Sequence, residues 1–431
     1  MKNITLFKIA LAILTLTLFL FITESVIFDF LMRVEARRLG VPAEKFIGNP
    51  AMRLNFSIPV AVNGFGLDFK VHDYAARNFS SVPAMYTTPV PLQKAFYGSP
   101  PLLHFFFRWV RLFPPDTART LWLALVLAGT LALSFFWLRE ANQASPSPDR
   151  DLTGPAQFAL AVLFMFSYPV IFSFERGASD FPVLFLYSAG AVFLRRRLWF
   201  ALGAVSVIAA LLKVYPLFPA LALSAAAFFL MFKNRRAGLL ILGGQAAAAA
   251  LTIGPLFKIH WHYARNVIWS VKELDVIDAN SHSLPYFYGK WGWIFWGCLY
   301  AVTTISLILR LVDYAASGRD KKEPLYRVLF TYACLLGMAT YVSSASYDYS
   351  LILLIPLFAL CLASVPTRQV FFTYAGFILL LAGYSAPRWI HVALRNSFVN
   401  DSMYAAVQAA GLLLLVSSQI FSRTKPSRPG S

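Results

Sequence analysis

The chain has 431 residues, of which 58 % are hydrophobic and only 13 % are charged. A soluble domain carries about 25 % charged residues, so this composition excludes a water-soluble globule, a disordered chain and a disulfide scaffold. The net charge of +18 comes mostly from short basic clusters between apolar segments, so it does not indicate nucleic-acid binding. The sequence therefore predicts an all-α polytopic membrane protein, with residues 1–431 forming a single integral membrane domain.

Apolar segments that approach the length of a membrane span recur along the whole chain. A spanning helix needs about 20 apolar residues, and we expect a bundle of about 12 such helices. The candidate spans are 9–32, 119–138, 156–174, 181–194, 198–213, 216–232, 237–257, 291–311, 328–345, 349–364, 370–386 and 403–422. Residues 100–113 are apolar but broken by charges, so we interpret them as an amphipathic or re-entrant piece.

Basic residues in the short loops predict the orientation of the bundle. Loops that alternate to one side carry clusters such as 195–197 and 233–236, and such clusters are typical of the cytoplasmic side. We therefore expect both termini in the cytoplasm of a cell with a bacterial type of plasma membrane. Two large segments, 33–118 and 258–290, then face outward. Most acidic residues also fall on the outward side, which indicates a site there.

The first outward segment contains an acidic residue at the start of a predicted amphipathic helix. In residues 65–79, Asp68 and His72 are four positions apart, and Ala75, Ala76 and Phe79 continue the same face. Asp68 could act as a general base whose pKa is raised by burial, or it could simply cap the helix. Asp73 lies on another face, at the spacing that favours an ion pair with Arg77.

Charged residues also mark the predicted outward ends of later spans. Glu175, Arg176 and Asp180 lie in a turn between two spans. Arg176 could bind a phosphate there, or it could form a local ion pair with Glu175 or Asp180. Lys213 ends a third span just before Tyr215-Pro216, and it could bind an anion or extend to the membrane surface.

The remaining candidates lie in the segment 258–290 and in a late outward turn. His282 could bind a phosphate or a sugar hydroxyl, or it could be a solvated loop residue. Tyr347 and Asp348 lie in SASYDYSL, where an aromatic belt accounts for the tyrosine but not for the carboxylate. His260 and His262 lack a third ligand at a useful spacing, so we expect neither a metal nor another cofactor.

Several short motifs occur in an order that resembles the integral-membrane glycosyltransferases of the GT-C fold, and most closely glycosyltransferase family 87. They are FGLDFKVHDYAARNF with a following MYTTP, then YGSPPLLHFFF, FERGASDFPVLFLYSAGAVF, LLKVYPLFP and SYDYSLILLIPLF. The resemblance covers most of 60–220 and 344–358. Ala178 stands where the family more often has Asn.

The resemblance implies a GT-C-like bundle that transfers a mannose-like hexose from a polyprenyl phosphate to an acceptor hydroxyl, with inversion, outside the cytoplasm. Asp68 would be the general base. The donor phosphate would be bound by Arg176, Lys213, Arg265, Lys290 and His282. Substrate contacts would come from Asp73, Glu175, Asp180, Tyr347 and Asp348. The expected partners are the lipid-linked sugar, a glycolipid or glycan acceptor and membrane lipids, and not nucleic acid.

Two other classes of function would explain some of the same features. A lipid flippase or small-molecule transporter would also need outward carboxylates and basic helix ends, together with a polar path across the membrane. A noncatalytic assembly protein would tolerate the loss of Asp68.

Overall fold

The structure is a computed structural model that describes residues 67–79, 99–145, 153–165, 179–265, 284–317, 322–341, 352–363 and 409–417, together with residues 37, 40, 86, 170, 173, 177, 376, 406 and 407. Within these residues all regular structure is helical and there is no strand. The helices in chain order are α3 (Leu67–Asn78), α5 (Pro101–Phe106), η2 (Phe107–Leu112), α6 (Pro115–Ala144), α7 (Gly154–Met165), α9 (Phe181–Arg195), α10 (Trp199–Leu212), α11 (Leu217–Leu230), α12 (Arg235–Ile253), α13 (Phe257–Tyr263), α14 (Leu284–Ala316), α15 (Lys322–Ala339) and α16 (Ile355–Ala363).

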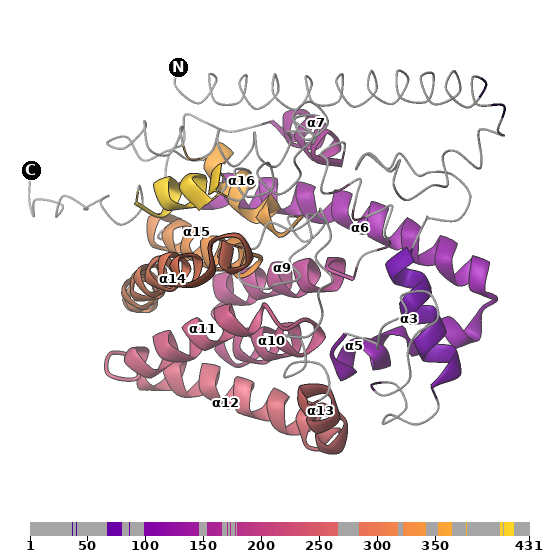
Figure 1. Cartoon of the computed structure of the whole chain (residues 1–431). Coiled ribbons are helices and arrows are strands. Elements are labelled where there is room, and N and C mark those ends of the chain that lie inside the picture. Colours follow the sequence, from indigo (N-terminus) through magenta and orange to yellow (C-terminus); the bar gives the residue numbers. More distant parts are fainter. Residues whose placement is uncertain are drawn as a thin grey trace, which may run out of the picture.

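The long helices lie roughly side by side and form one bundle (Figure 1). Consecutive helices α9, α10, α11 and α12 pack against each other, with α10 also against α12, and α14 joins this group through α11. The 30-residue helix α6 contacts α7, α9, α15 and α16. Tryptophan N–H groups join some of these layers: Trp137 donates to Ser188 Oγ at 2.8 Å, and Trp296 donates to the carbonyl of Met338 at 3.0 Å.

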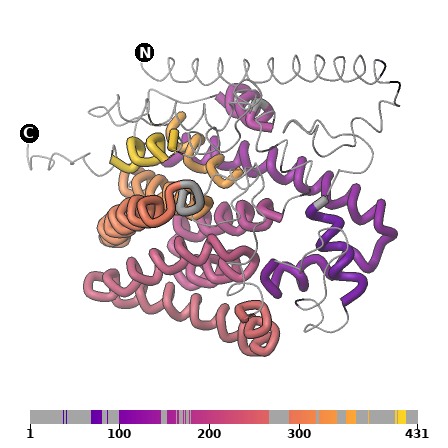
Figure 2. The backbone as a smooth tube through the Cα atoms, in the orientation of Figure 1, coloured from indigo at the N-terminus to yellow at the C-terminus, as the bar shows by residue number. Residues whose placement is uncertain are grey.

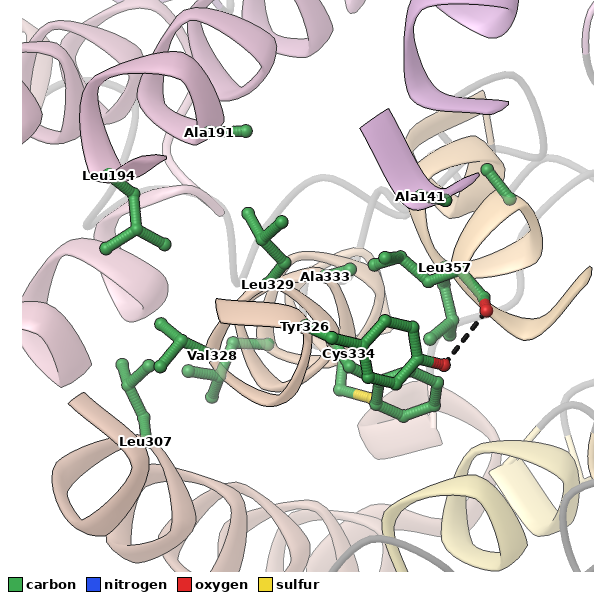
Figure 3. Close-up of a cluster of buried hydrophobic side chains, with 14 of the residues drawn as sticks. Ala141, Ala191, Leu194, Leu307, Tyr326, Val328, Leu329, Ala333, Cys334 and Leu357 are labelled. Carbon is green, nitrogen blue, oxygen red and sulfur yellow. Dashed lines mark hydrogen bonds between the residues drawn. The ribbon is translucent and has the colours of Figure 1, made fainter. Parts of the chain in front are cut away.

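Helix α15 forms the centre of the larger core. Nearly every residue from Leu325 to Ala339 is buried, which is typical of a helix enclosed on all sides rather than of an amphipathic surface helix. Figure 3 shows Leu329 and Ala333 of α15 among side chains from α6, α9, α14 and α16. The Tyr326 hydroxyl donates to the carbonyl of Leu360 at 2.9 Å, so this buried polar atom is satisfied.

Three described helices are long and apolar enough to cross a membrane, namely Pro115–Ala144, Arg235–Ile253 and Tyr288–Ala316. Four shorter apolar helices, Phe181–Arg195, Trp199–Leu212, Leu217–Leu230 and Ile352–Leu362, coincide with other predicted spans. The all-helical membrane class is therefore confirmed, whereas the count of about 12 spans stays a prediction. The candidate span 9–32 and nearly all of 370–386 lie outside the described residues.

Short helices gather at one end of the bundle. Helix α3 packs on η2, α5 and the start of α6, while α5 also contacts α10 and α13 (Figure 2). Val71 and Ala75 of α3 form a small buried cluster with Phe79, which directly follows this helix, with Tyr86 and with Tyr263 of α13. The segment 100–113 is one turn or so of α-helix followed by a 3-10 helix, too short to span a membrane, as its charge pattern predicted.

Basic loops that the sequence predicts on one side of the membrane lie together at the opposite end of the bundle. Arg195 forms an ion pair of 2.8 Å with Glu140 at the end of α6. Arg197 donates to the carbonyls of Tyr314 at 3.0 Å and Ser317 at 2.6 Å, at the end of α14. The loops after α6, α9 and α14 thus meet at the same end of the bundle. This is expected if alternate loops along the chain lie on the same side of the membrane.

Two glycines set the spacing between α10 and α12. A Cβ at Gly203 would lie 2.0 Å from the carbonyl oxygen of Ile241, and a Cβ at Gly244 would lie 2.0 Å from that of Phe200. Small residues that let two backbones touch are a common device of helix pairs in membranes. Gly243 is next to Gly244 but on the exposed side of α12, and a Cβ there would meet nothing within 4 Å.

We predict that Gly203→Ala and Gly244→Ala each destabilise the protein by about 2 kcal/mol, because overpacking forces the two backbones apart. Gly243→Ala is the matched control and should be neutral or slightly stabilising, because alanine is the better helix former. Melting temperatures of the purified protein in detergent measure the difference. Equal effects of Gly244→Ala and Gly243→Ala would show that the helices do not touch at these glycines.

Candidate active site

The candidate acid Asp68 is the second residue of α3 and lies in its first turn. An N-cap residue precedes the first helical residue, so capping does not describe this position. His72, one turn later on the same face, is buried, as are Ala75, Ala76 and Phe79. The predicted amphipathic helix and its buried face are therefore confirmed, and the face that begins with Asp68 points into the protein.

Two arginines attach α3 to η2. Arg77 donates to the carbonyls of Val110 at 2.6 Å and Phe113 at 2.8 Å, and Arg111 donates from η2 back to the carbonyl of Ala76. Asp73 accepts two bonds from Arg77, at 2.8 and 3.0 Å, which confirms the predicted i,i+4 pair. These contacts fix the orientation of α3 and hence of Asp68.

His72 lies in a closed, largely apolar site. Its ring stacks on that of Phe107, with centroids 4.5 Å apart and planes inclined by 7°. Burial lowers its pKa well below the usual value, and the positive charge of Lys213 and a smaller electrostatic effect of His104 act in the same direction. His72 is therefore neutral at neutral pH. Helices α3 and α10 both pack against α5 and share one buried apolar cluster, so the end of α10 lies near α3.

Lys213 follows the last residue of α10, in extended backbone with φ −142° and ψ 147°. Its Nζ lies 3.6 Å from Oδ2 of Asp180, which is 0 % exposed, and the lysine side chain itself is only 18 % exposed. Lys213 therefore points into the protein rather than out to a membrane surface. Tyr215, two residues on, donates its hydroxyl to the other carboxylate oxygen of Asp180.

Asp180 is placed by the turn that precedes α9. Its carbonyl accepts from the N–H of Leu184 in the first turn of that helix at 3.0 Å. Nearby, Gly177 has φ +65°, and its carbonyl accepts a 2.9 Å bond from the indole N–H of Trp122 in α6. The left-handed backbone at Gly177 is one that glycine adopts without strain. The turn before α9 thus places the Asp180 carboxylate inside the bundle, at this end of the helices.

A buried carboxylate beside a buried ammonium has two consequences. Asp180 compensates the charge of Lys213, which would otherwise be costly to bury, and it restricts where the ammonium can point. Lys213, His72, His104 and Asp180 come from α10, α3, α5 and the turn before α9, so four distant stretches of sequence meet here. We call these four residues together with Tyr215 the polar centre.

An apolar groove of about 540 Å³ runs beside the polar centre, between α10, α11, α12 and α13. Leu211 and Val214, which flank Lys213 closely in sequence, line it. Gln245 and Ser224 line the groove and belong to one polar network. Gln245 donates to Ser206 Oγ at 3.2 Å and accepts from Ser224 Oγ at 2.8 Å. The remaining walls are mostly alanine, leucine, valine and isoleucine side chains, so the groove suits a hydrocarbon chain.

The other predicted site residues have mixed outcomes. Arg265 and Lys290 are described and exposed, and the ammonium of Lys290 lies 5.4 Å from the ring centroid of its neighbour Trp291. Their predicted role at a phosphate stays a prediction. Five further residues lie outside the described part of the chain, namely Glu175, Arg176, His282, Tyr347 and Asp348.

Sequence reasoning missed the pairing of Asp180 with Lys213 and did not single out His72, His104 or Tyr215 as site residues. The i,i+4 relation of His72 to Asp68 was a signal that could have found His72. Nothing local connects Asp180 to Lys213, because the 32 positions between them contain two helices. Among the described residues no three His, Cys, Asp or Glu side chains come together as metal ligands.

We predict that Asp180→Asn destabilises the protein by about 3 kcal/mol, because it leaves the Lys213 charge buried without its counterion. The double variant Asp180→Asn/Lys213→Met should be more stable than Asp180→Asn alone. Melting temperatures in detergent give both comparisons. Glu323→Gln, which removes an exposed i,i+4 ion pair with Arg327, is the control and should cost about 0.5 kcal/mol or less. A double variant as unstable as the single one would contradict a buried ion pair.

Comparison with known proteins identifies part of the chain. Residues 97–272 match the model of glycosyltransferase family 87. The match contains Asp180, Lys213, Tyr215 and the whole apolar groove, while α3 with Asp68 precedes it. No curated protein and no solved structure matched the chain. The resemblance that the ordered motifs indicated is confirmed over these residues, so this part of the chain is similar to glycosyltransferase family 87.

Proposed function

We propose that the protein transfers a mannose-like hexose from a polyprenyl-phosphate donor to an acceptor hydroxyl on the extracytoplasmic side, with inversion, and that Asp68 is the general base. One observation carries the proposal. Helix α3, which carries Asp68 in its first turn, and α10, which ends just before the cation Lys213, both pack against α5, and the charge of Lys213 acts on His72 of α3. An acid and a fixed cation are the two groups that such a transfer needs.

The acid would take up the proton that the reaction releases. The acceptor oxygen forms a bond to the anomeric carbon while the bond from that carbon to the phosphate oxygen breaks. The proton of the acceptor hydroxyl goes to the Asp68 carboxylate, and the electron pair leaves with the polyprenyl phosphate. His72 is neutral, so it adds no positive charge that would compete with the proton for the carboxylate.

Lys213 would stabilise the negative charge of the leaving phosphate. An ammonium has three N–H donors, so Lys213 can face Asp180 and a phosphate oxygen at the same time. Asp180 restricts the position of the ammonium before the substrate arrives, which is the pre-organisation that electrostatic catalysis depends on. Arg176, Arg265, Lys290 and His282 are the further cations that we propose around the phosphate.

The apolar groove supports a lipid-linked donor rather than a nucleotide sugar. It is lined by Leu211 and Val214, which flank Lys213 in sequence, so a phosphate at Lys213 would lie close to the groove that takes its chain. Its exposed rim includes Leu217 and Leu221 of α11, which would face the acyl chains of a bilayer. A prenyl chain could thus enter sideways from the membrane.

The extracytoplasmic placement rests on the distribution of basic loops. Lys213, α3 and α13 lie at the end of the bundle opposite to Arg195 and Arg197. Because clusters of basic residues favour the cytoplasmic side, we place the polar centre outside and both termini inside the cell.

We predict that Asp68→Asn retains binding of a polyprenyl-phosphate sugar but lowers transfer by about 100-fold or more, because the amide cannot accept the proton. Donor binding and the rate of transfer are both measured with purified protein in lipid nanodiscs, using a radiolabelled donor and a crude glycolipid acceptor. Asp313→Asn, an exposed carboxylate near the opposite end of the bundle, is the control and should transfer normally. Normal transfer by Asp68→Asn would contradict the base, and lipid translocation without transfer would instead indicate a flippase.

We also predict that Ala249→Phe raises the KM for a long-chain donor about tenfold with little change in kcat. A tenfold change in KM corresponds to about 1.4 kcal/mol of binding free energy. That is the contribution of fewer than about two buried CH₂ groups of the donor chain. Ala249 lines the groove, whereas the neighbouring Ala250 is exposed and does not. Ala250→Phe is therefore the matched control and should leave the KM unchanged. Equal KM values for the two variants would exclude the groove as the chain site.

A further inference from the structure

The apolar groove ends inside the bundle. Helices α10 and α12 run toward the polar centre and α11 runs away from it, so the position of each lining residue along the groove follows from the sequence. The lining residues farthest from the polar centre are Val207 of α10, Ser224 of α11 and Gln245 of α12. These three residues therefore mark the inner end of the groove.

Close backbone contacts follow directly beyond this end. A Cβ at Gly203 would lie 2.0 Å from the carbonyl oxygen of Ile241, so α10 and α12 touch about one turn past the last lining residues. A Cβ at Gly238 would lie 2.5 Å from the carbonyl oxygen of Ala227, so α11 and α12 touch on the same side. Helix α12 is thus closed against both neighbours toward the basic loops, and the three helices spread apart only toward the polar centre.

The Gln245 side chain bridges the three helices at the inner end. Its amide N–H groups donate to Ser206 Oγ of α10 at 3.2 Å and to the carbonyl of Ala220 of α11 at 3.1 Å, and its oxygen accepts from Ser224 Oγ at 2.8 Å. Both N–H donors are therefore used within the protein. A hydrocarbon chain that moved past Gln245 would break these bonds and offer none in return, so the network limits how deep such a chain can go.

The depth of the groove matches about two isoprene units. Gln245 and Ile253 line it eight residues apart on α12, a rise of about 12 Å, and Ser224 and Leu217 line it seven residues apart on α11, a rise of about 10 Å. One isoprene unit adds four carbon–carbon bonds to a prenyl chain, or about 5 Å when extended. A longer chain must therefore turn sideways, past the exposed side chains of Leu217 and Leu221 on the rim.

We propose that the protein recognises only the two isoprene units next to the phosphate and leaves the rest of the prenyl chain in the bilayer. The proposal rests on the proposed function, because it defines the lipid part of the same donor. Units inside the groove are selected by length and shape, since protein interiors are close-packed. Units beyond it meet lipid, which is as apolar as a leucine side chain, so they add no affinity. The donor class is therefore a prenyl phosphate sugar of two or more units, whatever its full length.

Photo-crosslinking of the full chain in lipid nanodiscs tests how far the protein follows the prenyl chain. The probes are four versions of geranylgeranyl phosphate, each with a diazirine on a different one of its four isoprene units, counted from the phosphate. Mass spectrometry identifies the labelled peptides and lipids. We expect units one and two to label α10, α11 and α12 about fivefold more than units three and four, because a pocket covers about 70–90 % of its ligand. Equal labelling by all four units, or labelling of lipid alone by units one and two, would overturn the proposal.

The variant Gln245→Ala should deepen the groove by about one unit, because it removes about 4 Å of side chain. Ser206 still donates to the carbonyl of Gly203 at 2.7 Å, and Ser224 to that of Ala220 at 3.0 Å, so neither hydroxyl loses its acceptor in the backbone. Unit three should then label the protein as strongly as unit two. Melting temperatures check that the variant folds.

A second variant, Ala246→Leu, should shorten the groove without touching the network. Ala246 lines the groove next to Gln245, whereas Ala250 is exposed one turn further along α12 and does not line it. Unit two should label the protein about fivefold less in Ala246→Leu, and normally in the control Ala250→Leu. Unchanged labelling in either folded variant, Gln245→Ala or Ala246→Leu, overturns the limit at Gln245 alone. Asp68→Asn should keep the wild-type labelling and lose transfer, and normal transfer by it overturns the proposed function alone.

Discussion

The ion pair between Asp180 and Lys213 is the interaction on which the arrangement of the candidate site depends. The Asp180 carboxylate is 0 % exposed, so burying its charge requires a counterion beside it. The Lys213 ammonium is that counterion, and it comes from the turn between α10 and α11. This requirement brings the end of α10 against the turn before α9 and leaves the charge of Lys213 close enough to lower the pKa of His72 on α3. The buried pair thus gives the site its cation and limits the directions in which that cation can act.

Tight packing elsewhere in the bundle keeps this end in place. Gly203 and Gly244 allow the backbones of α10 and α12 to touch, and α15 is enclosed by its neighbours along most of its length. These contacts are rigid because close-packed cores do not deform continuously. By contrast, the groove between α10, α11 and α12 is open to a hydrocarbon chain, so one group of helices combines a fixed scaffold with a place for a lipid.

The sequence predicted the class of fold and the order of its parts, because apolar length and basic loops are local properties that a membrane imposes directly. It also predicted α3, its buried face beginning at Asp68, and the pairing of Asp73 with Arg77, since helical spacing alone determines which residues meet. It could not predict the partners of Asp180 and Lys213, which depend on how separate helices pack. The apolar groove was missed for the same reason, as it lies between four separate helices.

Asp68, Lys213 and the apolar groove are proposed to serve one lipid-linked substrate, and the rest of the mechanism depends on this. A density map of the full chain in lipid nanodiscs with a bound polyprenyl phosphate tests it most directly. We expect the phosphate beside Lys213, its chain in the groove formed by α10, α11, α12 and α13, and the Asp68 carboxylate facing the position of the transferred sugar. A phosphate bound away from Lys213 and α3, with the groove empty, would contradict it.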